Sequence, residues 1–281
     1  MLMKFAGVLE RFWRKEMKAE YTWVGCHKNF VDEISTKTVG PIVLGRFGGN
    51  STAGQLKNED GCVIWTDGEK GYEFAVLLDA HSTADSAELV ASEFEKQKEE
   101  IKNILRLPVK KSFEELEKRI LSLFTDEDFR KRCRELRGET ACLIAVRKEN
   151  FLWWFSIGDC LLHLYHPELA ALKEYQQNHR SFFEWVGKVN TFELQVPCYS
   201  IGRKELRSGR NHILLTTDGL VECPDGGFNK PETIFESFQQ LTNEEGTRKL
   251  LTAIKEKNVR DSTTILSWII ENGSAASEPS K

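Results

Sequence analysis

The sequence lacks the features that would place it in a membrane, disulfide-rich or zinc-ribbon class. Its 281 residues contain no apolar run long enough to cross a membrane. Its seven cysteines are odd in number and include no C-x-x-C pair, and Cys62, Cys142 and Cys160 lie inside apolar runs. This pattern argues against a disulfide framework or a zinc site, and it predicts buried thiols in a reducing, cytoplasmic compartment.

An excess of positive charge is also missing. The chain has 39 basic and 43 acidic residues, which gives a formal net charge of -4. Nucleic-acid binding normally requires a basic face, so we predict no nucleic-acid partner. The first ten residues are too charged for a signal peptide, and we predict no membrane association.

No stretch rich in proline, glycine or serine divides the body of the chain, and no internal repeat is present. We therefore predict one large domain over residues 40–272, an extension of helix and strand packed on it over residues 1–39, and a disordered tail over residues 273–281. Apolar residues at helical spacing predict that the extension begins with a docked amphipathic helix, with a partner-binding or membrane-surface helix as the alternative: Leu2, Phe5, Leu9, Phe12 and Trp13.

The order of apolar patterns does not alternate as in a doubly wound sheet. Strands are predicted at 41–47, 62–66, 72–79, 140–147, 151–157, 160–165, 212–217 and 262–270. Helices are predicted at 84–105, at 112–136 with a break near Thr125-Asp126, and at 231–240 and 243–257. The segment 167–196 fits neither pattern. Strands grouped before and after helices indicate an α+β fold with antiparallel sheets and helices outside.

Three aspartates stand at the ends of strand-like apolar runs. They are Asp79, Asp218 and Asp261, and an acidic pair, Glu59-Asp60, precedes them. A single aspartate after a strand is usually a turn residue, but several together, without Cys or His clusters, suit a hard cation. The sequence thus predicts a Mg²⁺ or Mn²⁺ site at one end of a sheet.

These residues form part of a series of motifs that resembles the metal-dependent serine/threonine protein phosphatases of type 2C, in their bacterial form. The motifs occur in the family's order: Asn58-Glu59-Asp60, Asp79-Ala80-His81, Gly138-Glu139-Thr140-Ala141, Gly158-Asp159, Thr217-Asp218-Gly219 and Asp261-Ser262-Thr263-Thr264. The resemblance implies an α-β-β-α four-layer sandwich, in which two stacked antiparallel sheets are flanked by helices.

The resemblance also implies a metal centre and a mechanism. Two Mn²⁺ or Mg²⁺ ions would activate a bridging hydroxide that attacks the phosphorus of a phosphomonoester directly. Asp79 would bridge both ions and the Ala80 carbonyl would be a further ligand. Asp218 and Asp261 would hold the second ion. Glu59 and Asp60 would contact metal-bound waters.

Two further roles are carried over from the family. His81 matches the residue that protonates the leaving alkoxide, and a histidine suits this role because its ordinary pKa lies close to neutral pH. Asp159, Asp218 and Glu222 are the candidates for a third, weaker metal site.

The sequence departs from the family at the phosphate-binding position. The arginine that usually precedes the acidic motif is absent, and Gln55 stands at the expected offset. Lys57 is the nearest cation, and Arg46 on the preceding strand is the other candidate for the substrate phosphate. A lysine binds phosphate as a point charge and cannot form the bidentate fork of an arginine.

The leading hypothesis is a cytoplasmic signalling hydrolase that dephosphorylates phosphoserine or phosphothreonine in a protein substrate. We predict that it is a monomer. A small-molecule phosphomonoesterase is an alternative within enzymes, and an open site would favour proteins. The second class is a regulatory or phosphate-binding protein of phosphatase fold with weak or no turnover, which the missing arginine motivates. A scaffold without a metal role is the third class.

Overall fold

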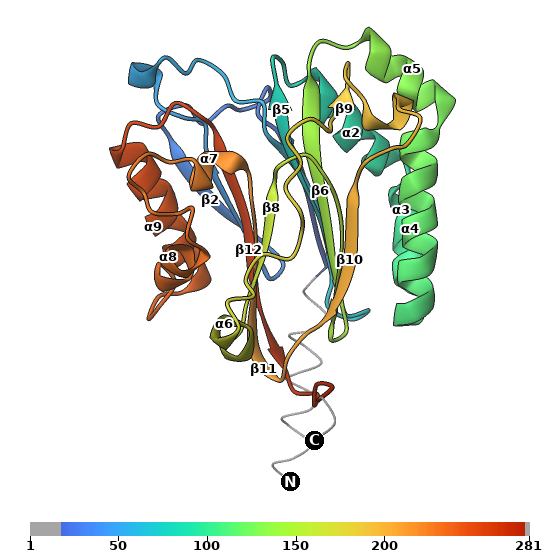
Figure 1. Ribbon diagram of the computed structural model, residues 1–281, viewed down its shortest axis with the longest axis vertical. Helices are drawn as coiled ribbons and strands as arrows, with labels where there is room; N and C mark the ends of the chain where they lie inside the picture. The colour runs from blue at the N-terminus through green and yellow to red at the C-terminus, as the bar shows by residue number, and fades with distance from the viewer. Residues whose placement is uncertain (1–17, 279–281) are drawn as a thin grey trace.

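Two antiparallel sheets lie face to face in the centre of the protein, and helices cover their outer faces (Figure 1). The computed structural model describes residues 18–278. The first sheet follows the order β1 (Lys18–Val24), β4 (Gly61–Asp67), β5 (Tyr72–His81), β6 (Glu139–Lys148), β7 (Phe151–Ile157) and β10 (Ser200–Glu205), with the short β9 (Val186–Gly187) paired to β6. The second follows β2 (Ile34–Val39), β3 (Ile42–Phe47), β12 (Thr263–Asn272), β11 (Gly209–Thr216) and β8 (Leu161–Tyr165).

The helices divide between the two outer faces (Figure 1). The first sheet is covered by α2 (Asp85–Lys96), α3 (Lys98–Leu105), α4 (Val109–Thr125) and α5 (Glu127–Glu135). The second is covered by α7 (Asp218–Val221), α8 (Pro231–Glu236) and α9 (Asn243–Glu256). The remaining helical turns are η1 (Ser51–Ala53), α6 (Pro167–Ala171) and η2 (Thr191–Glu193). The predicted four-layer α-β-β-α sandwich is confirmed.

Strand β5 shows why the central strands read as unbroken apolar runs. Successive side chains of a strand point to opposite faces of the sheet. Phe74 and Val76 pack under the helices, whereas Ala75 and Leu77 pack against the second sheet. Because both faces are buried, no position between Phe74 and Leu78 can be polar without a partner, and the run ends only at Asp79.

Most predicted elements are present. The break predicted near Thr125-Asp126 is the boundary between α4 and α5, where the Asp126 side chain accepts a hydrogen bond from the Phe129 amide and caps α5. No separate strand was predicted at β1, β2, β9 or β10, although the extension over residues 1–39 was expected to contain strand. Two of them pair within the sheets at residues 18–39, so this part of the predicted extension is integral to the sandwich.

The two ends of the chain are described only in part. The amphipathic helix predicted within residues 2–13 lies outside the described residues. Residues 273–278 have no regular structure, yet Ser277 donates its amide to Glu205 and accepts from Arg207. Among the described helices, none is both long and apolar enough to span a membrane. All seven cysteines are free thiols.

Candidate metal centre

The ends of four strands bring the predicted aspartates to one place. Asp79 is near the end of β5, Asp159 follows β7, Asp218 begins α7 directly after β11, and Asp261 precedes β12. Because β11 and β12 are paired neighbours, the residues that flank them meet: the Thr217 amide donates to the Thr264 carbonyl at 3.1 Å. The pairing therefore fixes Asp218 beside Asp261.

Gly219, the residue after Asp218, is required by this close approach. A Cβ atom at Gly219 would lie 2.2 Å from the Ser262 carbonyl oxygen, well inside van der Waals contact. Any larger residue would push the start of α7 away from the segment that carries Asp261. The glycine in the Thr217-Asp218-Gly219 motif thus lets the backbones that carry Asp218 and Asp261 approach each other.

Three of the carboxylates form a compact, buried group. Asp79, Asp159 and Asp218 each offer an oxygen, and these oxygens all lie within 4.8 Å of one another. Their residues are only 5%, 5% and 8% exposed. Oδ2 of Asp79 and Oδ1 of Asp159 are buried without a hydrogen-bond partner. A buried carboxylate oxygen without a donor is costly unless a cation compensates it, so this donor set fits a hard divalent cation.

The pKa values of the group follow from the same crowding. Burial, and then the charge of Asp218, raise the pKa of Asp79 well above its usual range. Burial and the neighbouring Asp261 raise the pKa of Asp218 to about 7. Burial and the charge of Asp60 raise the pKa of Asp261 to about 6, although Asp261 lies at the solvent-exposed rim. Without a cation these carboxylates resist full ionisation at neutral pH.

Asp60 lies behind the group and is completely buried. Ser262 Oγ donates to its Oδ1 at 2.8 Å, and Thr264 Oγ1 donates to its Oδ2 at 2.6 Å. Burial raises the pKa of Asp60 to about 7, and the two hydroxyl donors oppose this rise. Both oxygens of Asp60 are thus already held by the protein, whereas one oxygen of Asp79 and one of Asp159 have no hydrogen-bond partner.

A cleft of about 350 Å³ opens over the carboxylates. It is lined by Gln55, Lys57, Glu59, Asp79, Ala80, His81, Ser82, Arg260, Asp261 and Ser262. Lys57 forms an ion pair with Glu59 and donates to the Ser82 carbonyl, so both of its partners belong to the same rim. The structure thereby brings together the predicted residues Lys57, Glu59, Asp79, Ala80, His81 and Asp261 in one cleft.

Ala80 and His81 complete the end of β5. Ala80 pairs with Thr140 of β6 and is absent from the residues with positive φ, so an alanine replaces the family's glycine without strain. His81 is exposed at the mouth, and its ring centroid lies 4.9 Å from that of Trp185 in an edge-on contact. The aromatic edge limits the directions in which the imidazole can point.

Arg46 does not reach the cleft. Its side chain is buried between β2 and β1, donates to Tyr21 Oη and Ser35 Oγ at 2.9 Å each, and lies 4.3 Å from the Phe30 ring centroid. Arg260 lines the cleft instead. It is adjacent to Asp261 in the sequence, which is the one signal that could have found it.

An arginine lies between Glu222 and Asp159. Arg180 Nη2 lies 3.0 Å from Glu222 Oε1 and 4.0 Å from Asp159 Oδ2, and Arg180 Nε donates to the Asp159 carbonyl at 3.1 Å. A guanidinium therefore lies between two of the three residues expected at the third metal site. Sequence reasoning missed Arg180 because it lies in the irregular segment between α6 and β9.

Comparison with solved structures identifies the fold. A bacterial serine phosphatase matches with a TM-score of 0.60 at 13% identity over 83% of this chain and 99% of its own. Stp1 from Staphylococcus aureus, a serine/threonine phosphatase, matches with a TM-score of 0.57 at 13% identity, covering 85% and 94%. RsbX in complex with magnesium matches with a TM-score of 0.52 at 13% identity, covering 84% and 100%.

These structures share this chain's fold across nearly their whole length. The type 2C phosphatase fold predicted from the motifs is confirmed. No protein-family model matches the sequence, and no curated protein matches it either. At such low identity the likeness shows the fold, and the chemistry has to be argued from the residues of this chain.

Proposed function

We propose that the protein is a divalent-metal-dependent phosphomonoester hydrolase that removes phosphate from phosphoserine or phosphothreonine in proteins. The observation that carries this proposal is the buried group of Asp79, Asp159 and Asp218, with two carboxylate oxygens that no protein donor satisfies. A purely structural group of acidic residues would be expected to have hydrogen-bond or cationic partners, as Asp60 has.

The proposed metal ligands are those that the resemblance implies, except Glu222, which is paired with Arg180. Asp79, Asp218 and Asp261, with the Ala80 carbonyl, would hold Mn²⁺ or Mg²⁺, and Asp159 would join them from the β7–β8 turn. Bound divalent cations would neutralise phosphate charge and lower the pKa of a coordinated water near neutral pH. Asp60, buried behind the grouped carboxylates, would position the neighbouring ligands. Glu59, at the rim of the cleft, would position metal-bound waters.

The remaining groups of the cleft would bind and orient the ester. Lys57 and Arg260 are the cations that line it, and they would attract the phosphate that the missing family arginine would otherwise grip. His81 stands exposed at the mouth, where the alcohol of the substrate would leave, and it would donate a proton to the departing oxygen. Trp185 restrains the imidazole for that transfer.

The surroundings of the cleft favour a protein substrate. A second hollow of about 320 Å³ shares Lys57, Glu59 and Ser82 with the cleft and continues past Cys26 and Asn29. A metabolite would fill one enclosed cavity, whereas a phosphorylated residue within a chain needs an approach for its flanking residues on both sides. Two adjoining hollows on one rim supply such an approach.

The decisive test is hydrolysis of a chromogenic aryl phosphate and of a phosphothreonine peptide, each with Mn²⁺, with Mg²⁺ and with a chelator. We expect metal-dependent turnover that falls by at least about 100-fold in Asp79→Asn, because mutation of a mere supporting residue already costs 10–100-fold. Asp126→Asn, which alters only a helix cap far from the centre, is the matched control.

Folded protein that binds Mn²⁺ and phosphopeptide yet shows no turnover would overturn hydrolysis and favour the regulatory, phosphate-binding alternative. The Lys57–Glu59 pairing and the absent arginine are the observations on which that alternative rests. Turnover of aryl phosphate and of small metabolites with none of the peptide would retain the hydrolase and reject the protein substrate.

A further inference from the structure

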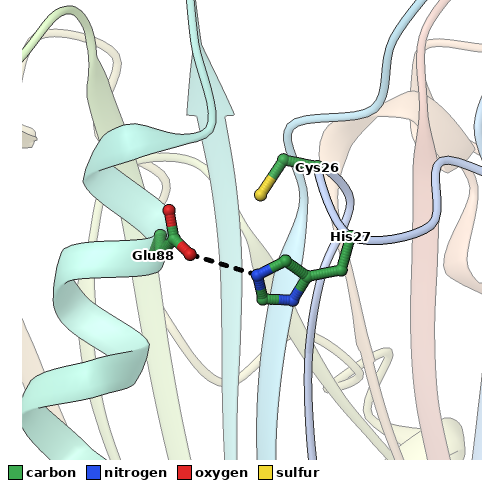
Figure 2. A group of neighbouring side chains, drawn as sticks. All are labelled: Cys26, His27 and Glu88. Carbon is green, nitrogen blue, oxygen red and sulfur yellow. Dashed lines mark hydrogen bonds and ion pairs between the residues drawn. The ribbon is translucent and has the colours of Figure 1, made fainter.

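A second group of ligating side chains lies apart from the aspartates, on the turn that follows β1 (Figure 2). Cys26 and His27 are consecutive residues of this turn, and Glu88 faces them from the first turn of α2. One thiol, one imidazole and one carboxylate therefore converge from two segments that are 61 residues apart. No sequence pattern joins them, because only the packing of α2 on the first sheet makes them neighbours.

The spacing of the three ligand atoms is close to that of a tetrahedral metal site. His27 Nε2 and Glu88 Oε1 are 3.1 Å apart. The Cys26 Sγ atom lies within 4.8 Å of a ring nitrogen of His27 and of a carboxylate oxygen of Glu88. Bonds of about 2.0–2.1 Å at tetrahedral angles place nitrogen and oxygen ligands about 3.3 Å apart. The nitrogen–oxygen pair is already close to that separation, and the sulfur lies near enough to join the same ion.

Both supports of the group are fixed. The Gly25 amide donates to the Asp60 carbonyl at 2.8 Å, and the His27 amide donates to the Val24 carbonyl at 3.0 Å. A Cβ atom at Gly25 would lie 2.3 Å from the Asn58 carbonyl oxygen, so the turn is pressed against the segment that carries Glu59. On the other side, Ala87 and Val90 of α2 are buried, and they hold the helix backbone on either side of Glu88 in place. Ligands on fixed supports lose little entropy when they bind a metal.

We propose that Cys26, His27 and Glu88 bind one Zn²⁺ ion, which ties the turn after β1 to α2 and leaves a fourth coordination position open to solvent. Thiolate and imidazole ligands select Zn²⁺ over Mg²⁺ and Mn²⁺, which prefer oxygen ligands such as those of the aspartate group. The thiol gives its proton to the solvent as the sulfur–zinc bond forms. The side chains of His27 and Glu88 are 60% and 54% exposed, so the ion needs no opening of the fold to enter.

The site shares no ligand with the aspartate group, and its test can be read without any turnover. Full-length protein is stripped of metal, given excess Mg²⁺ to occupy the aspartate group, and titrated with Co²⁺ as a spectroscopic substitute for Zn²⁺. Sulfur coordination gives a thiolate-to-cobalt charge-transfer band in the near ultraviolet. We expect this band at one equivalent of Co²⁺, its displacement by Zn²⁺, and a Zn²⁺-dependent rise in the thermal midpoint.

Variants assign the band to the proposed ligands. Cys26→Ser removes the band, and His27→Gln weakens Zn²⁺ binding at least tenfold. Cys198→Ser is the matched control, because Cys198 is the other exposed cysteine of the described chain and should leave the band unchanged. Asp79→Asn is the second control. Cys160 is buried close enough to Asp79 and Asp159 to feel their charge, and a band from Cys160 would change in that variant.

Three results would overturn the proposal. These are the absence of a thiolate band in the Mg²⁺-loaded wild type, a band of equal intensity in Cys26→Ser, and a band lost in Asp79→Asn. The first would leave His27 and Glu88 as a surface ion pair. The other two would move the bound cobalt to another cysteine.

Discussion

Asp60 differs from its acidic neighbours in that the protein satisfies both of its oxygens. The donors are the hydroxyl groups of Ser262 and Thr264, which stand on either side of Thr263 at the start of β12. Asp60 feels the charge of Asp218, and Asp261 in turn feels the charge of Asp60. A change in how Asp60 is held should therefore reach the metal ligands even though Asp60 itself is not part of the grouped carboxylates.

Thr264→Val tests this coupling. Valine keeps the branched shape and removes the hydroxyl that donates to Asp60 Oδ2, which leaves a buried carboxylate oxygen without a donor. We expect Mn²⁺ affinity, measured by calorimetric titration, to fall roughly 10–100-fold, as for other residues that orient a metal ligand. The free energy of unfolding should fall by about 1–3 kcal/mol.

Thr264→Ser restores the donor and should recover most of the affinity. Equal Mn²⁺ affinity in the valine variant and the wild type would show that Asp60 has no part in positioning the ligands. Equal losses in the valine and serine variants would show that the threonine methyl group, and not the hydroxyl, matters.

The residues at the centre were predictable to different degrees. Asp79, Asp218 and Asp261 were identifiable because each stands at one end of an apolar run, where a carboxylate can leave the buried strand. Arg180 and Arg260 gave no such signal. Arg180 contacts Asp159 and Glu222, and these contacts depend on how an irregular segment folds back against them.

At the scale of elements, burial on both faces separates the predicted strands from the missed ones. The long apolar runs of β5 and β6 are buried throughout their central residues. By contrast, β1, β2 and β10 are the edge strands of their sheets, and many of their side chains are exposed or half-buried. Edge strands carry polar and charged residues that discourage pairing with other chains, so their sequences resemble loops.

The first turn of helix α9 can be altered without touching the end of the helix that leads to Asp261. It packs on β3 so closely that a Cβ atom at Gly45 would lie 2.4 Å from Thr247 Cγ2. Its first turn is held by a capping box, in which Thr242 and Glu245 each satisfy a backbone amide of the other. Its opposite end leads into the segment that carries Asp261.

Thr242→Ala removes the cap at the end of α9 that is remote from Asp261. We expect a loss of about 1 kcal/mol in the free energy of unfolding, measured by urea denaturation, because the Glu245 backbone amide loses its side-chain acceptor. Metal affinity and hydrolysis should remain at wild-type values. Thr252→Ala, in the middle of the same helix, is the control and should not destabilise the protein, since alanine is the better helix former.

A drop in Mn²⁺ affinity in Thr242→Ala protein that is fully folded would contradict the prediction that the cap of α9 does not affect the metal site. It would mean that the packing of α9 on the second sheet transmits movement of its first turn to the Asp261 segment.

At the scale of the whole molecule, the sandwich buries three apolar layers: one between the sheets, and one under the helices on each side. His163 and His212 are two of the histidines buried in this packing. His212 donates or accepts a hydrogen bond with Ser267 Oγ at 2.7 Å, whereas Nδ1 of His163 has no partner. Burial lowers the pKa of His163 to about 4, and burial together with Arg210 lowers that of His212 to about 3.

These two imidazoles make folding sensitive to acid. Between about pH 4 and pH 6.5 the unfolded chain binds a proton at His163 that the folded chain excludes. The stability contributed by the neutral form is therefore fully present above about pH 6.5 and decreases as the pH falls. Each such histidine changes the free energy of unfolding by about 1.4 kcal/mol per pH unit in that window.

His163→Phe isolates the effect, because phenylalanine fills the buried space and cannot be protonated. From pH 7 to pH 5, urea denaturation should show the wild type losing about 2 kcal/mol more than the variant. The carboxylates of the metal centre titrate alike in both proteins, so they cancel in this difference. His179→Gln, at an exposed histidine, should follow the wild type. Equal losses of unfolding free energy in the wild type and His163→Phe would contradict this account. They would show that His163 is hydrated or protonated in the folded state, and that water enters the packing around it on β8.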